Sequence, residues 1–174
     1  AKKVLKKKIL SNFIGSFEKD FRGNSFYGGY YVQKLERAFE KKFRVKHAVS
    51  VNSWTSGLTI AIASLDISPG DEVIVTPWTM TACVAAILHN NAIPIFVDIE
   101  KSTYNIDPKL VEKKITKKTK AILAVDIFGQ SCDIVNLLKL CKKYNLKLIT
   151  DSAQAPGVKN KLGITGTQAD IGGY

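Results

Sequence analysis

The chain has 174 residues, 45% of them hydrophobic and 24% charged, which is enough apolar sequence for a globular core and unlike a disordered chain. Lys and Arg outnumber Asp and Glu by 26 to 15, yet no DNA- or RNA-binding motif accompanies the formal charge of +11. The chain has three cysteines without a C-x-x-C pair, two distant histidines and only short apolar stretches. These features predict a cytoplasmic protein with no metal, nucleic-acid or membrane contact.

The first third of the chain changes from basic to amphipathic. Five lysines fall within the first eight residues, and we expect residues 1–26 to form a basic arm that precedes a domain at 27–174. Apolar residues from Val32 to Phe43 recur at helical spacing and predict an amphipathic helix. The apolar run 48–51 then predicts a strand, and Asn52-Ser53 predicts the N-cap of a helix that runs through Leu65.

Strands and helices alternate through the remainder. Pro69-Gly70-Asp71 marks a turn, and Asp107-Pro108 marks the start of a helix. Strands are predicted at 72–76, 93–97, 121–125 and 146–150 and from 170 onward, helices at 79–89, 108–115 and 133–144, and a hairpin at 157–163. This alternation predicts an α/β fold with a largely parallel sheet. The chain ends within a predicted strand, so we expect it to be a fragment.

Polar and aromatic residues gather after three predicted strands, at the edge where parallel sheets bind ligands. Asn52–Gly57 brings hydroxyl groups and free backbone N–H groups to a helix N-terminus, which suits a phosphate, although such a segment taken alone is more often a plain helix cap. Trp78 offers a stacking face for a planar ligand, or a core or interface contact. Asp151 and Gln154 follow a buried strand, where Asp151 either pairs with a pyridinium nitrogen or caps a turn.

Six motifs together resemble the DegT/StrS-type nucleotide-sugar aminotransferases, relatives of aspartate aminotransferase, from about Tyr27 to the last residue. The motifs are Gly28-Gly29 with the Leu35-Glu36 helix, Asn52–Leu58, Pro69–Val75, Phe96-Val97-Asp98 with Asn105-Ile106-Asp107, Phe128-Gly129-Gln130, and Asp151–Ala155. The resemblance implies a truncated three-layer α/β/α large domain that binds pyridoxal 5'-phosphate (PLP). It also implies a homodimer with the cofactor at the subunit interface.

The resemblance further implies roles for individual residues. Thr55 and Ser56, next to Trp54, would hold the PLP phosphate, and Trp78 would stack on the ring. Asp151 would be the catalytic partner of the pyridine nitrogen, and Gln154 would reach the ring hydroxyl. The implied reaction transfers an amino group from an amino acid, typically glutamate, to a keto group of a nucleotide-linked sugar, for amino-sugar or polysaccharide biosynthesis.

Two departures from the family pattern matter. The family usually has a small residue where this chain has Trp54, which predicts a differently shaped phosphate loop. The Schiff-base lysine of the family would lie beyond Tyr174, and Lys159 and Lys161 in the predicted hairpin do not take its place, so we expect this chain to be inactive alone. A PLP-dependent sugar dehydratase of the same family and a non-catalytic basic α/β binding module are the alternatives.

Overall fold

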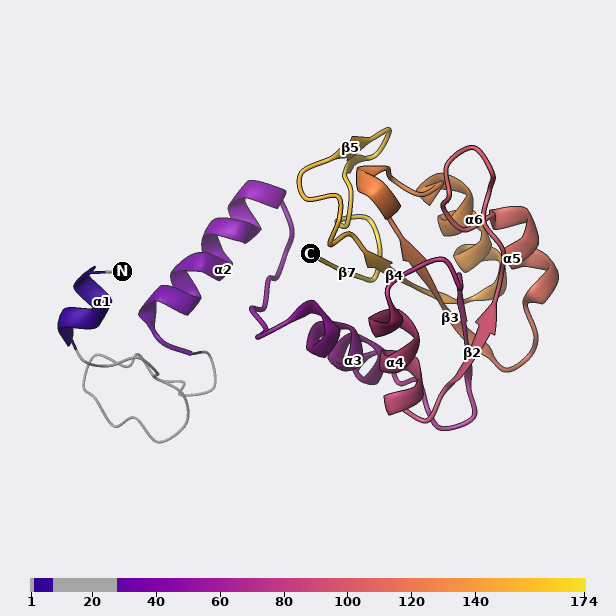
Figure 1. The fold of residues 1–174 in the computed structure, drawn as a ribbon, viewed down its shortest axis with the longest axis horizontal. Helices are drawn as coiled ribbons and strands as arrows, with labels where there is room; N and C mark the ends of the chain where they lie inside the picture. Colours follow the sequence, from indigo (N-terminus) through magenta and orange to yellow (C-terminus); the bar gives the residue numbers. More distant parts are fainter. Residues whose placement is uncertain (1, 8–27) are drawn as a thin grey trace. The chain divides into compact units, whose positions relative to one another are not determined.

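The computed structural model describes residues 2–7 and 28–174, which fall into two compact units, Ala1–Ser50 and Val51–Tyr174 (Figure 1). The first unit contains α1 (Lys2–Lys7) and α2 (Tyr30–Phe43). Helix α2 is the predicted amphipathic helix, and its Phe39 and Phe43 rings stack with centroids 4.0 Å apart. The predicted domain boundary at 26/27 lies outside the described residues and stays a prediction.

A five-stranded parallel sheet forms the centre of the second unit (Figure 1). The strands are β1 (Glu72–Val75), β2 (Ile93–Phe96), β3 (Thr119–Val125), β4 (Lys147–Asp151) and β7 (Ile171–Gly173). Their spatial order is β2-β1-β3-β4-β7, and every neighbouring pair is parallel. All five strands therefore end at the same edge of the sheet, as predicted from the alternating pattern.

Helices cover both faces of this sheet. Helices α3 (Trp54–Ser64) and α4 (Thr81–His89) share one buried cluster with side chains such as Val73 and Leu123. Residues of α5 (Pro108–Lys114) and α6 (Ile134–Tyr144) share another with side chains such as Ile74 and Ile122. Adjacent strand residues point to opposite faces, which explains the division. The expected three-layer α/β/α architecture is confirmed.

Side-chain caps start helices α3 and α5 where the sequence predicted them. The Ser53 hydroxyl accepts a hydrogen bond from the Ser56 backbone N–H at 3.2 Å and begins α3. The Asp107 carboxylate accepts one from the Lys109 N–H at 2.8 Å, with Pro108 as the first residue of α5. Such caps satisfy backbone donors that have no partner within the helix.

Of three local predictions, one strand is wrong, one helix starts later than expected, and one hairpin is confirmed. The strand predicted at 48–51 is wrong: the segment is irregular, Val49 is 80% exposed, and no described strand pairs with it. An apolar run forms a strand only beside a neighbour that completes its hydrogen bonds. Helix α4 begins at Thr81 and not at Thr79, whereas the predicted hairpin is present as β5 (Lys159–Asn160) and β6 (Gly163–Ile164).

No helix among the described residues has the length and apolar character needed to cross a membrane.

Candidate functional site

A cavity of about 260 Å³ lies at the carboxyl edge of the sheet. The ends of β3 and β4 and the starts of α3 and α4 surround it. It is lined by Trp54, Thr55, Thr79, Met80, Ala82, Val125, Asp151, Ala153 and Gln154. Four of the six residues singled out from the sequence, Trp54, Thr55, Asp151 and Gln154, are therefore brought together, although they come from segments about 100 residues apart.

Asp151 is the most constrained polar group of the cavity. It ends β4, is 7% exposed, and receives three hydrogen bonds. The Trp54 indole N–H donates to Oδ1 at 2.9 Å, and the Ala153 backbone N–H donates to the same oxygen at 3.1 Å. The Cys83 thiol donates to Oδ2 at 3.1 Å. A buried carboxylate needs such donors, because it has lost its hydration.

Cys83 is a member of the site that was not identified from the sequence. It lies in the first turn of α4 with no exposed surface. Burial and then the negative charge of Asp151 raise the pKa of the Cys83 thiol to about 12. The thiol therefore stays protonated near neutral pH and can donate to Asp151. The Thr79 hydroxyl lies 3.3 Å from the Cys83 sulfur and continues this network toward the cavity wall.

The N-terminus of α3 opens onto the cavity through Thr55. Only part of the predicted phosphate loop faces the cavity: Ser56 is not among the lining residues, and its hydroxyl lies 3.1 Å from that of Ser53. The first backbone N–H groups of a helix lack intrahelical acceptors and carry the positive end of the helix dipole. Because the Ser56 N–H is already bonded to the Ser53 hydroxyl, this end of α3 offers the Thr55 side chain and the N–H groups of Trp54 and Thr55 to an anion.

Trp78 does not line the cavity. Its ring is half exposed and lies 6.2 Å, centroid to centroid, from that of Tyr104, which in turn lies 6.2 Å from the Phe128 ring. The residues that do reach the cavity from this segment are Thr79 and Met80. Stacking of Trp78 on a ligand ring therefore stays a prediction.

Gln154, another lining residue, is held by the backbone of Phe128. Its side-chain oxygen accepts a hydrogen bond from the Phe128 backbone N–H at 2.8 Å. Phe128 has a positive φ of 54°, which a non-glycine residue adopts only with some strain. With its oxygen engaged in this way, Gln154 has its amide NH₂ to offer to a ligand.

A second buried carboxyl group stands beside Asp151 at the end of β3. Asp126 accepts hydrogen bonds from the Ser152 hydroxyl at 2.6 Å and the Cys132 backbone N–H at 2.8 Å. Burial raises the pKa of Asp126, the two hydrogen bonds oppose this rise, and the charge of Asp151 adds to it. Asp126 does not line the cavity. Its contacts instead fix Ser152 and the loop after β3.

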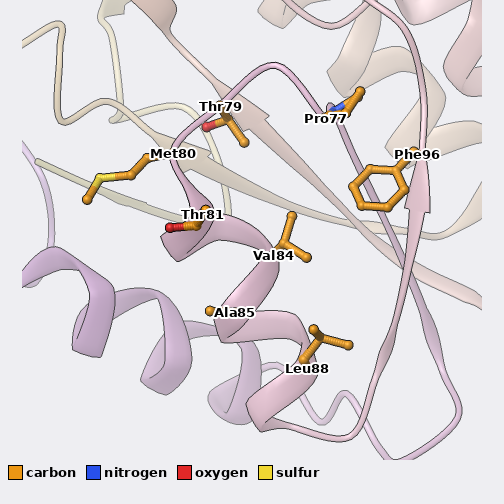
Figure 2. A pocket seen from close by; sticks show the side chains of 8 residues that line it. All are labelled: Pro77, Thr79, Met80, Thr81, Val84, Ala85, Leu88 and Phe96. Atoms are coloured by element: carbon orange, nitrogen blue, oxygen red, sulfur yellow. The ribbon is translucent and has the colours of Figure 1, made fainter.

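A larger and more apolar hollow, about 390 Å³, adjoins the site between α4 and β2 (Figure 2). Val84 and Leu88 of α4 and Phe96 of β2 point into this gap from its two sides (Figure 2). Thr79 and Met80 line both hollows, so they form the boundary between them. Within residues 2–7 and 28–174, no group of three His, Cys, Asp or Glu side chains could hold a metal ion.

The sequence of residues 7–174 matches the sequence model of the DegT/DnrJ/EryC1/StrS aminotransferase family. The chain is 42% identical to dTDP-3-amino-3,6-dideoxy-alpha-D-galactopyranose transaminase of Aneurinibacillus thermoaerophilus and 43% identical to GDP-perosamine synthase of Escherichia coli O157:H7. Each match covers 143 residues, 82% of this chain and 39% of the relative, so the chain spans well under half of their length.

A solved structure is similar over nearly the whole chain. It is that of Escherichia coli GDP-4-keto-6-deoxy-D-mannose-3-dehydratase with bound hydrated PLP, which has a TM-score of 0.81 and 26% sequence identity. The match covers 98% of this chain and 41% of the dehydratase. The described fold is thus one that holds PLP in a relative.

Proposed function

The chain belongs to the DegT/DnrJ/EryC1/StrS aminotransferase family, and we propose that the protein containing it uses PLP to transfer an amino group from an amino acid, most simply glutamate, to a keto group of a nucleotide-linked sugar. The names of the relatives, one a dTDP-sugar transaminase and one a GDP-perosamine synthase, support a nucleotide-sugar substrate. The amino donor and the sugar are both part of the proposal.

One observation carries the cofactor assignment: Asp151 is a buried carboxylate whose hydrogen-bond donors are all neutral. Trp54, Ala153 and Cys83 donate to it, and no lysine or arginine among the described residues forms a salt bridge with it. A buried anion is stabilised by a cationic partner. A protonated pyridine nitrogen in the adjoining cavity would supply that cation, so the residues present fit PLP.

The remaining lining residues fit the other parts of the cofactor. Thr55 and the first two N–H groups of α3, those of Trp54 and Thr55, would hold the phosphate, because these donors and the helix dipole favour an anion there. Gln154 would donate its NH₂ to the ring hydroxyl, and Met80 would cover part of the ring. Bound PLP supplies an electron sink for the bond changes at the amino carbon, and Asp151 supports it by holding the proton on the ring nitrogen.

The cavity has a volume of about 260 Å³. Most ligand pockets are larger, at about 300–1,000 Å³. We propose that the site is completed by residues outside this chain, from the rest of the protein and from the second subunit of a homodimer.

The cytoplasmic location and the division into a basic arm at 1–26 and a cofactor domain at 27–174 stay proposals as well.

The test uses the full-length protein. PLP is added, its visible absorbance on the protein is recorded, and glutamate is then supplied without a sugar. Loss of the visible absorbance, with formation of 2-oxoglutarate in an amount equal to the protein, supports transamination. A protein that binds no PLP, or that binds it without converting glutamate, contradicts the proposal.

A PLP-dependent sugar dehydratase is the second candidate, because the E. coli dehydratase matches 98% of the chain. Addition of a nucleotide-linked 4-keto sugar to the glutamate-treated protein separates the two. A dehydratase would consume a nucleotide-linked 4-keto sugar with loss of water and no lasting transfer of nitrogen to the product. Mass spectrometry of the sugar product distinguishes a gained amino group from a lost hydroxyl group.

A further inference from the structure

Trp54 occupies a notch that two glycines create. Its indole lies against Gly57, one turn along α3, and against Gly173 on β7. A Cβ atom added to either glycine would overlap the six-membered part of the indole. Neither glycine has a φ in the left-handed region, so glycine is required there for space and not for backbone conformation.

The notch determines where the indole N–H points. With the six-membered ring held between the two glycines, Nε1 reaches Oδ1 of Asp151 at 2.9 Å, across 97 residues of sequence. The Ala153 N–H reaches the same oxygen, and the Cys83 thiol reaches Oδ2. Two donors on one oxygen and one on the other fix the rotation of the carboxylate, because turning it would break at least two of these bonds.

From this arrangement we infer that Trp54 is a positioning residue of the cofactor site, which uses the notch formed by Gly57 and Gly173 to hold the Asp151 carboxylate in the orientation that receives the cofactor's ring nitrogen. This inference rests on the proposed function, which identifies the ligand of the cavity as PLP. Trp54 acts through Asp151: its indole N–H is committed to the carboxylate, and it takes no part in proton transfer.

The first test measures the affinity of the full-length protein for PLP by absorbance titration. Trp54→Phe removes the N–H donor and keeps an aromatic ring in the notch, so we expect PLP binding to weaken by roughly tenfold, the effect of one hydrogen bond to a charged group. We also expect the pH titration of the bound cofactor's absorbance to shift, which a loss of packing alone would not produce. Unchanged or tighter PLP binding with an unchanged titration would refute the inference.

Tyr144→Phe is the matched control. Tyr144 lies on α6, and its hydroxyl donates to Glu112 at 2.9 Å, so this variant also removes one hydrogen-bond donor from an aromatic side chain. PLP affinity and titration should stay at the wild-type values in this control. If Trp54→Phe and Tyr144→Phe behave alike, Trp54 has no special role.

The second test needs no cofactor and examines the notch itself. Gly173→Ala should lower the melting temperature of the apoprotein in the wild-type background, because the new methyl group overlaps the indole. In a Trp54→Ala background the same substitution should cost much less. Equal costs in both backgrounds would show that the indole does not occupy the notch.

The outcomes also separate this inference from the proposed function. If the wild-type protein binds no PLP, the cofactor assignment fails whatever the variants do. If the wild type binds PLP and Asp151→Asn weakens binding while Trp54→Phe does not, only the positioning role of Trp54 fails.

Discussion

Replacing Asp151 by Asn tests the chemistry of the site most directly. The amide has the shape of the carboxylate but only one acceptor oxygen. If that oxygen stays where Trp54 and Ala153 donate, the NH₂ group faces the Cys83 thiol and one hydrogen bond to a charged group is lost. Such a bond contributes about 1.5–3 kcal/mol. Removal of a buried charge offsets part of this loss, so the free energy of unfolding should fall by less than about 3 kcal/mol.

The effect on the reaction should be much larger than the effect on stability. A neutral amide at this position cannot hold a proton on the ring nitrogen by charge, so the half-reaction with glutamate should slow by about 100- to 1,000-fold, as when one preorganised electrostatic partner is removed. Rapid mixing of the PLP-loaded full-length protein with glutamate measures this rate. Urea denaturation of the same variant checks that it is folded.

Asp170→Asn is the appropriate control. Asp170 precedes β7, pairs with Lys147 at 3.0 Å at the surface, and lies outside the cavity. Its substitution should leave the half-reaction rate unchanged. An Asp151→Asn protein that is folded, binds PLP and reacts with glutamate at the wild-type rate would remove Asp151 from the mechanism.

Three further substitutions test the thiol, the core and a helix cap. Cys83→Ser should reduce the loss of stability at alkaline pH. The thiol pKa is about 12 in the folded protein against an ordinary value of 9.0, so the wild-type free energy of unfolding falls as pH rises above 9. At pH 10 this fall amounts to about 1.4 kcal/mol. Urea midpoints at pH 7 and pH 10 measure the difference, and equal pH dependence in both proteins would contradict it. Leu123→Ala empties a fully buried position in β3 and should cost about 2–5 kcal/mol of unfolding free energy, whereas Leu162→Ala at an exposed site should cost less than about 0.5 kcal/mol. Asp107→Ala removes the cap of α5 and should cost about 1 kcal/mol in the same assay; no loss would show that the cap is dispensable.

Most of the second unit could be predicted because its determinants are local. Alternation of apolar runs with amphipathic segments defines β1 to β4 and α3 to α6, and caps such as Ser53 and Asp107 define where helices start. The segment 48–51 was mispredicted because a strand depends on a neighbour that the run itself does not specify. The same composition can be strand or irregular chain according to what lies beside it.

The candidate site was predicted in part, for a related reason. Asp151 and Gln154 follow a strand end, which is visible in the sequence. The contacts of Asp151 are not visible, because Cys83 and Trp54 lie 68 and 97 residues away from it. Helix α4 also starts two residues later than expected, and the residues just before it, Thr79 and Met80, line the cavity, while the Trp78 ring lies beside that of Tyr104.

The space shared by Trp54, Gly57 and Gly173 restricts the order in which these three positions can change during evolution. A relative with a larger residue at either glycine position could not accept tryptophan at position 54 without a steric clash. The glycines must therefore come first or together with it, and they are free to diverge only after the tryptophan is lost. Among homologues, tryptophan at this position should occur with glycine at both of the others, while glycine there should occur without tryptophan.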